Sequence, residues 1–391
     1  MGSLYLAWRY VVYHRIKTTI LVTSIALVIF LPFGLRVLVD QSSDELIARA
    51  RATPLVIGAR GSALELVLNS LYFESKQPET SRYAELSRVA DTGFAEPIPL
   101  LVRFRAQGHP VVGTTLEYLD FRGLRLTAGR HMAVLGEAVL GAEVARELGL
   151  APGDSLVTSP ESLFDFAGAY PLKLNVVGVL DPRNAPDDDV VFVDIKTSWV
   201  IQGLGHGHQD LADPSAASAV LSREGRRITA NASVVEYNEI TQANIDSFHF
   251  HGALDDYPVT AVIAVPHDEK SRVLLMGRYQ GTSEVVQVVQ PTGVMNELLE
   301  TVLTIQDYAI AALAIVGMAT FCVAVLVFML SLRLRGREIE TMVKIGGARG
   351  SIAAMLWVEV VAVLVFAASA AGGLTLFIGR FGSSAIRALL L

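Results

Sequence analysis

Three long stretches of this chain carry almost no charge, and they constrain the fold more than any other feature. Residues 18–35 and 308–332 contain no Asp, Glu, Lys or Arg, and residues 352–379 contain only Glu359. A helix rises about 1.5 Å per residue, so each stretch can cross the roughly 30 Å hydrocarbon layer of a bilayer. The 52% hydrophobic content is also high for a soluble protein. The sequence therefore predicts three membrane spans.

A cleavable signal peptide is the alternative interpretation of the first stretch. Its apolar run is longer than the core of a usual signal peptide, and no small-residue cleavage site follows it. We therefore expect the first stretch to stay in the chain as a transmembrane helix.

The distribution of Lys and Arg predicts the orientation. Residues 9–17 carry three basic residues and no acid, and residues 333–350 carry five basic residues and two acids, for a combined charge of +6. The whole chain carries −7, so the remaining residues carry −13. Basic segments near span ends stay in the cytoplasm. The region between the first two spans, about residues 36–307, is therefore expected to be external.

The external region mixes strand-like and helix-like segments without a regular repeat. Residues 62–73 are typical of a helix, whereas residues 97–106 and 258–266 are typical of strands. This mixture predicts an α+β domain, which we divide into two subdomains. The expected organisation is an amphipathic cytoplasmic segment (1–17), the first transmembrane helix and stalk (18–40), the external domain (41–300), a stalk and second transmembrane helix (301–332), a cytoplasmic loop (333–350), the third transmembrane helix (351–379) and a short tail (380–391).

The cytoplasmic loop predicts a short amphipathic helix. Glu340 and Lys344 form a favourable i,i+4 pair, Gly346 and Gly347 are expected to end the helix, and Ser351 is a candidate cap for the next one. The apolar face combines four residues at helical spacing: Ile339, Met342, Val343 and Gly346. The loop is either a simple positive-inside anchor or a docking surface for a cytosolic partner.

Several segments resemble a known family. The segment "RGREIETMVKIGGARGSIAAMLWVEVV" (335–361) is similar to the coupling-helix segment of FtsX-like permeases, also called MacB-type or type VII ABC transporters. The segments "EAVLGAEVARELGLAPGDSLV" (137–157) and "VVGVLDPRNAPDDDVVFVDI" (176–195) resemble the external domain of MacB-like and LolC-like proteins. The resemblance covers both ends and much of the middle of the chain.

The resemblance implies a permease subunit in the bacterial inner membrane with its large domain in the periplasm. A separate cytosolic ABC ATPase dimer would bind ATP, and a second permease copy or a homologue would complete the assembly. ATP hydrolysis would move the external domain by mechanotransmission. The residues that match the coupling motif are Arg337, Glu338, Ile339, Met342, Val343, Gly346, Gly347 and, in the next helix, Glu359.

Catalysis by this chain is not expected. The sequence contains no G-x-x-x-x-G-K-[ST] phosphate loop, no G-x-S-x-G elbow, no H-E-x-x-H motif and no paired-cysteine metal site. No nucleic acid is expected among the partners. Three functions stay open: a transport permease, a transmembrane regulator of a periplasmic partner, and a permease that extracts lipids or lipoproteins.

The chain departs from the family pattern after the third span. The family has at least four spans, but residues 380–391 are too few to cross a bilayer. Either a short tail follows a single third span, or a break near Gly372 and Gly373 divides two compressed spans. We favour the single span with a tail.

Two features of the third span point to contacts with protein. Glu359 is costly in lipid, so it should snorkel to the headgroups, pair with an arginine of the loop, or face other protein groups. The small-residue steps Ala367/Ala371 and Ala368/Gly372 suit close helix packing, which we expect against another subunit.

Histidines form two H-x-H pairs in the external domain, His206 with His208 and His249 with His251. Side chains at i and i+2 of an extended segment point the same way, so each pair can offer two imidazoles to one metal. The nearby acids Asp210, Asp246, Asp255 and Asp256 could complete an N/O shell for Zn²⁺. The alternative is incidental loop composition. The run of acids at residues 187–189 is interpreted as a turn rather than as ligands.

Overall fold

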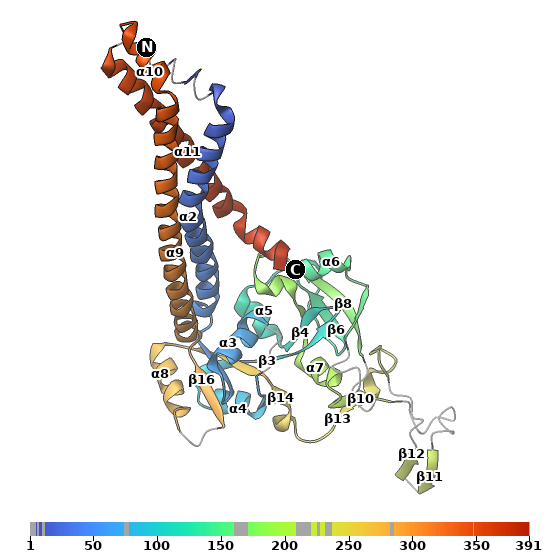
Figure 1. Cartoon of the computed structure of the whole chain (residues 1–391). Coiled ribbons are helices and arrows are strands. Elements are labelled where there is room, and N and C mark those ends of the chain that lie inside the picture. The colour runs from blue at the N-terminus through green and yellow to red at the C-terminus, as the bar shows by residue number, and fades with distance from the viewer. Residues whose placement is uncertain are drawn as a thin grey trace. The chain divides into compact units, whose positions relative to one another are not determined.

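The computed structural model describes residues 5, 8–9, 12–73, 78–159, 171–208, 220–224, 227–230, 237–281, 285–346 and 348–390. The chain divides into two compact units (Figure 1). The helical unit comprises Met1–Ala48 and Asn296–Leu391, and the domain comprises Arg49–Met295. Each unit is described by itself.

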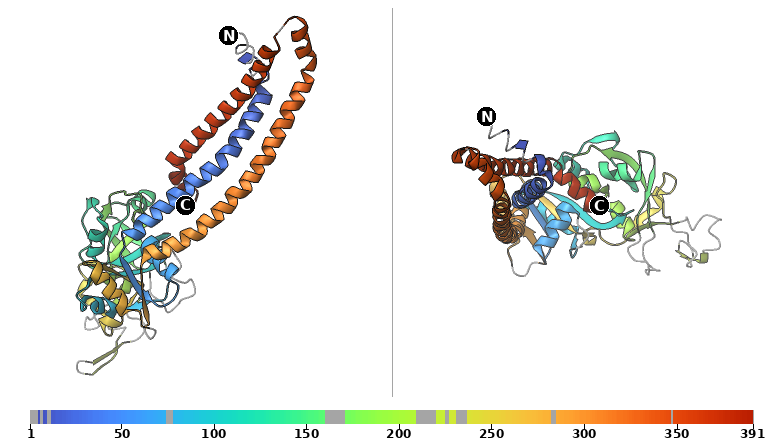
Figure 2. Two further views of the ribbon diagram at one scale, coloured as in Figure 1. Left: turned by 90° about the vertical axis from the view of Figure 1, so that its left-hand side faces the viewer. Right: turned by 45° about the horizontal axis from the view of Figure 1, so that its top comes forward.

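The helical unit contains three helices that are long and apolar enough to cross a membrane. They are α2 (Arg15–Arg51), α9 (Pro291–Leu334) and α11 (Arg349–Leu390), and the short α10 (Gly336–Lys344) follows α9. α2 extends beyond both limits of the predicted helix 18–40 and contains Pro32 in its interior. The two views in Figure 2 show the three long helices side by side.

Small residues join α2 to α11. Ala367 and Ala371 are 0% and 2% exposed, and both pack against Ala26 of α2. The prediction that this pair contacts another subunit was therefore wrong, because the contact lies within the chain. Ala368 and Gly372, the second predicted step, lie on an exposed side of α11.

α11 continues past the predicted end of the third span as one helix. It has no break at Gly372 or Gly373, so the alternative of two compressed spans is not what the chain adopts. The predicted tail is helical through Leu390, and Gln41 Nε2 of α2 donates a 2.6 Å hydrogen bond to the Gly379 carbonyl. α11 begins at Arg349, so Ser351 lies inside the helix instead of capping it.

The domain is built on one hydrogen-bonded path of strands in the order β16-β1-β15-β3-β4-β9-β6-β8-β5, with β7 paired to β8. The path strands are β1 (Leu55–Ala59), β3 (Ala95–Ala106), β4 (His109–Thr114), β5 (Leu126–Gly129), β6 (Glu137–Leu140), β7 (Ser155–Val157), β8 (Lys173–Leu180), β9 (Val191–Asp194), β15 (Ala261–Pro266) and β16 (Val286–Val289).

Short strand pairs and helices complete the domain. The pairs are β2 (Ser81–Arg82) with β14 (Pro258–Val259), β10 (Gly205–Gly207) with β13 (Phe248–Phe250), and β11 (Val220–Glu224) with β12 (Arg227–Ala230). The helices are α3 (Ala63–Tyr72), α4 (Ala84–Ala90), α5 (Leu116–Arg122), α6 (Ala142–Leu148), α7 (Ile195–Ile201) and α8 (Glu269–Arg278), with one-turn helices η1 (Pro186–Asp189), η3 (Ile245–Ser247) and η4 (Leu254–Asp256).

The long strand β3 is shared by two halves of the path. Its first part pairs with β15 from Ala95 to Leu100, and its second part pairs with β4 from Leu101 onward. The register of the β3–β4 pairing shifts between Val102 and Phe104, as it does at a β-bulge. The predicted mixture of strands and helices is confirmed, and the division into two subdomains stays a prediction.

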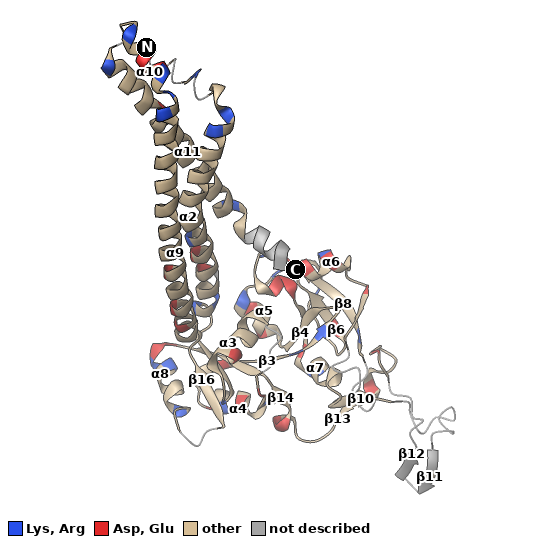
Figure 3. Ribbon diagram, viewed as in Figure 1, with Lys and Arg blue, Asp and Glu red and all other residues tan. Residues whose placement is uncertain are grey.

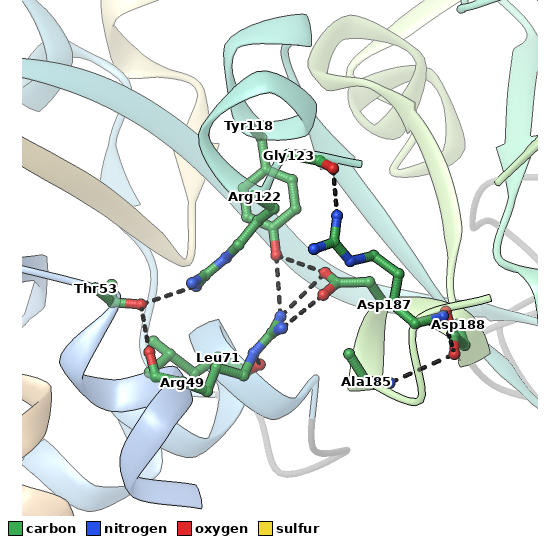
Figure 4. A network of polar contacts seen from close by, with 10 residues as sticks. Arg49, Thr53, Leu71, Tyr118, Arg122, Gly123, Ala185, Asp187 and Asp188 are labelled. Atoms are coloured by element: carbon green, nitrogen blue, oxygen red, sulfur yellow. Dashed lines mark hydrogen bonds and ion pairs between the residues drawn. The ribbon is translucent and has the colours of Figure 1, made fainter. Parts of the chain in front are cut away.

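A buried ion pair connects the last turn of α2 to the domain core (Figure 4). Arg49 donates from Nη1 to Asp187 Oδ2 at 2.5 Å and from Nη2 to Asp187 Oδ1 at 3.0 Å. The Tyr118 hydroxyl donates to the same carboxylate at 3.0 Å, and Arg49 Nε donates to the Leu71 carbonyl. The network therefore joins α2, α3, α5 and η1. The acids at 187–189 do form the predicted turn, but Asp187 is 3% exposed within it.

The network shifts the pKa of two of its members. Burial alone would raise the pKa of Asp187, but the charge of Arg49 and its hydrogen bonds hold that pKa below its usual range. Burial raises the pKa of the Tyr118 hydroxyl to about 12, and the neighbouring Asp187 carboxylate acts in the same direction.

Replacing Asp187 tests the energetic weight of this pair. Asp187→Asn leaves the buried Arg49 charge without a counter-charge, which is expected to cost about 3–5 kcal/mol in unfolding free energy. The exposed pair between Arg82 and Asp256 supplies a matched control, since Asp256→Asn should cost less than about 1 kcal/mol. Urea unfolding in a Trp8→Phe/Trp357→Phe background leaves the buried Trp199 as the fluorescent reporter. Equal costs for the two variants would contradict the assigned role of Asp187.

The same residues predict that the stability of the domain falls at both low and high pH. The pKa of Asp187 is lower in the folded than in the unfolded chain, so its contribution is present above about pH 3.9 and is lost as pH falls through the folded pKa. The pKa of Tyr118 is raised to about 12, so its contribution is complete below about pH 10 and is lost as pH rises toward 12. Urea midpoints across pH should show the alkaline arm weakened in Tyr118→Phe and the acid arm weakened in Asp187→Asn.

Candidate functional site

The predicted loop helix is present as α10, between α9 and α11. Residues 336–344 are helical, and Gly346 adopts a φ of 92°, the left-handed conformation that ends many helices. The i,i+4 pair is confirmed, because Lys344 Nζ lies 2.9 Å from Glu340 Oε1. Gly347, the second predicted stop residue, lies outside the described residues.

The exposed surface of α10 differs from the predicted apolar face. Ile339 and Met342 are partly buried, whereas Val343 is 38% exposed. Ile345, which the helical spacing did not include, is 80% exposed. Arg337 is also exposed, in the first turn of α10. An apolar tip of Val343 and Ile345, on either side of the exposed Lys344, is therefore the part of α10 that is open to a partner.

Charges gather where α10 and the first turns of α2 lie, while the middles of the long helices carry almost none (Figure 3). Arg335, which directly precedes α10, is buried and donates from Nη1 to Glu359 Oε2 at 3.0 Å. Its Nε also lies 3.6 Å from Glu338 Oε2. Glu359 therefore pairs with a loop arginine, one of the outcomes that the sequence allowed.

Lys17 brings the first helix into the same group. Lys17 Nζ donates to Ser331 Oγ at 2.5 Å and lies 4.0 Å from Glu359 Oε1. The three long helices thus contribute Lys17, Ser331 and Glu359 to one polar group, and α10 adds Arg335. Neither Arg335 nor Lys17 was singled out from the sequence as a partner of Glu359. A lone acid in a span, opposite basic residues at span ends, was the signal that could have indicated them.

The two predicted histidine pairs come together in the domain. β10 and β13 pair antiparallel, with His206 opposite His249. These two rings lie 4.8 Å apart between centroids. His251 lies 4.8 Å from His249 and 5.1 Å from His206, and His208 lies 5.2 Å from His249. We call these four residues the histidine cluster.

The opposite face of the same ribbon is aromatic. Phe248 and Phe250 alternate with the histidines and pack against the hydrophobic core. Gly205 and Gly207 leave room for these rings, because an added Cβ would come within 2.5 Å of Phe250 and of Phe248, respectively. The Tyr257 hydroxyl lies 2.8 Å from the His251 carbonyl and 3.3 Å from the Leu204 carbonyl, so it joins one end of both strands.

The predicted acidic ligands that the structure describes, Asp246, Asp255 and Asp256, are not part of the histidine cluster. Ligand atoms of His206, His208 and His249 lie within 4.8 Å of one another, and among the described residues no acid belongs to that group. Asp256 instead pairs with Arg82 at 3.4 Å. Asp210 lies outside the described residues.

A second polar group was not predicted. His109 Nδ1 lies 2.5 Å from Asp189 Oδ1, and His109 Nε2 lies 3.5 Å from Glu147 Oε2. The group links β4 to η1 and α6, next to the Arg49 network on η1. Its three residues are more than 35 positions apart in sequence, so no local pattern indicates it.

Comparison with known proteins supplies the family. A family model described as the MacB-like periplasmic core domain matches residues 19–239, more than half of the chain. A search of curated proteins finds no match.

Three solved structures also align with the chain. The periplasmic region of MacB from Actinobacillus actinomycetemcomitans is 10% identical with a TM-score of 0.36, over 65% of this chain and 97% of that one. The extracellular domain of the noncanonic ABC-type transporter YknZ from Gram-positive bacteria is 12% identical with a TM-score of 0.32, over 60% and 98%. A domain of a putative permease from Porphyromonas gingivalis is 13% identical with a TM-score of 0.26, over 60% and 85%.

At these TM-scores the three structures carry no part of the assignment, which rests on the family model together with the membrane-spanning helices. The chain belongs to the MacB-like periplasmic core domain family of ABC transporter permeases.

Proposed function

We propose that this chain couples ATP hydrolysis by a separate cytosolic ABC ATPase to movement of its external domain. The exposed tip of α10, formed by Val343 and Ile345 on either side of the basic Lys344, carries the proposal. A small apolar surface with a charged rim is a common form of protein interface. The excess of Lys and Arg around α10 supports a cytoplasmic position for this tip.

The contacts of Arg335 offer a route from α10 to the long helices. Arg335 holds the start of α10 to Glu359 of α11, and Lys17 of α2 lies beside the same carboxylate. A displacement of α10 would therefore act on α11 and α2 through charged groups that are costly to separate at low dielectric. α2 is one unbroken helix that ends at Arg51, inside the first residues of the domain. α9 is one unbroken helix that begins at Pro291, inside the last residues of the domain.

This arrangement favours mechanotransmission. No intervening linker separates α2 or α9 from the domain, so a helix that moves would carry the adjoining domain residues with it. We expect the permease to work as two copies, or with a homologue, on an ATPase dimer in the bacterial inner membrane.

Extraction of lipids or lipoproteins is the second candidate function. It calls for an apolar cleft at the external ends of the spans. An apolar groove of about 450 Å³ does lie between α2, α9 and α11, but Lys17 and Glu359 line it. Because the proposed topology places Lys17 at the cytoplasmic end, this groove does not favour uptake from the external leaflet. Regulation of a periplasmic partner is disfavoured by the large size of the domain, Arg49–Met295.

Substitution at the tip of α10 tests the proposed contact. Val343→Glu places a charge in the interface and should weaken binding to the partner ABC ATPase by roughly tenfold or more. Val273→Glu, on the exposed face of α8 in the domain, is the matched control and should leave binding unchanged. Affinity is measured with both proteins purified and the permease in nanodiscs. If the two variants bound the ATPase with equal affinity, α10 would not be the docking surface and would serve only as a membrane anchor.

The Arg335–Glu359 pair tests transmission separately from docking. Glu359→Gln should retain ATPase binding but lower the stimulation of ATP hydrolysis by the permease roughly tenfold, because the link from α10 to α11 is weakened. Glu359→Asp keeps the negative charge beside Arg335 and Lys17 and should retain part of the stimulation. If Glu359→Gln still stimulated ATP hydrolysis fully, the Arg335–Glu359 pair would not transmit movement from α10 to α11.

A further inference from the structure

We infer that the histidine cluster binds a divalent metal ion, with Zn²⁺ as the best match, through the imidazoles of His206, His208 and His249. The inference does not rest on the proposed coupling to an ATPase, because it concerns the domain alone. It rests on the meeting of two sequence pairs, about 40 residues apart, on one face of a two-stranded ribbon.

The distances suit a metal centre. The three histidines place ligand nitrogens within 4.8 Å of one another. Nitrogens bound to one tetrahedral Zn²⁺ lie about 3.3 Å apart, given Zn–N bonds of about 2.0–2.1 Å. Rotations of the imidazole side chains can close that difference without moving the strands. His251, whose ring lies 4.8 Å from that of His249, is in position to supply the fourth nitrogen.

The backbone holds the imidazoles on one side before any ion arrives. Side chains alternate across a strand, so the histidines take one face and the rings of Phe248 and Phe250 take the other. The two phenylalanine rings pack against the core and against Gly205 and Gly207. This packing keeps the histidine face of the ribbon turned away from the core. His249 Nδ1 lies 2.9 Å from the Ser247 carbonyl, an arrangement that leaves Nε2 as its ligand atom.

The donor set selects the class of ion. Among the described residues the cluster offers nitrogen ligands and no carboxylate, which disfavours Mg²⁺ and Ca²⁺ and favours Zn²⁺ and its borderline neighbours such as Ni²⁺ or Cu²⁺. His206, His208 and His249 are half-buried and His251 is exposed. Solvent therefore reaches the site directly, so the ion can exchange with the external medium and is not enclosed as a structural zinc.

Titration of the full chain with Zn²⁺ tests the inference. The protein is purified in detergent without a polyhistidine tag, and Zn²⁺ binding is followed by calorimetry. One equivalent should bind, and Co²⁺ in its place should give the intense visible absorption of tetrahedral coordination. His206→Ala/His249→Ala should weaken this binding at least about tenfold and abolish the Co²⁺ band.

A matched variant and a fold control make the result decisive. His131→Ala/His267→Ala removes two exposed histidines of the same domain and should bind as the unaltered chain does. In the Trp8→Phe/Trp357→Phe background, unchanged fluorescence of the buried Trp199, which contacts Phe250, shows that the ribbon still packs in each variant. His249→Gln supplies a milder change if His206→Ala/His249→Ala unfolds. Zn²⁺ affinity that is equal in all variants, or Co²⁺ spectra without the tetrahedral band, would overturn the inference.

Discussion

The ion pair between Arg335 and Glu359 is the interaction on which the helical unit depends. A carboxylate within an apolar span is costly unless a cation or hydrogen-bond donors meet it. Arg335 provides that cation from the start of α10, and Lys17 approaches from α2. The position of α10 follows, because the residue that precedes it is held at α11 while its far end remains exposed. The domain repeats the principle, since Arg49 is buried only because Asp187 meets it with two hydrogen bonds.

The sequence predicts best where one physical cause acts over consecutive residues. Uncharged stretches predicted the three long helices, and helical spacing with two glycines predicted α10. The predicted apolar face of α10 was incomplete because Ile345 lies just beyond the helix, where periodicity no longer applies. The small residues of α11 were assigned to the wrong neighbour. Their spacing predicts close packing but does not specify which helix approaches, and here it is α2.

Contacts between distant residues could not be predicted in the same way. The two H-x-H pairs are visible in the sequence, but no local pattern predicts that His206 and His249 lie directly opposite each other on paired strands. That register depends on Gly205 and Gly207 accepting the rings of Phe250 and Phe248, a tertiary fit. Asp246, Asp255 and Asp256, chosen for their nearness in sequence, did not join the cluster for the same reason. Arg49, Asp187 and His109 likewise meet their partners only through the order of strands in the sheet.

Pro32 has a mechanical consequence for α2. Proline has no N–H, so the carbonyl four residues earlier, at Val28, loses its helical donor. The Val28 side chain also lies where the small Gly317 of α9 leaves space. The bending stiffness of α2 is therefore lowest around this turn, while the turns on either side keep their full set of hydrogen bonds. Bending of α2 is thus concentrated at the turn that contains Val28 and Pro32.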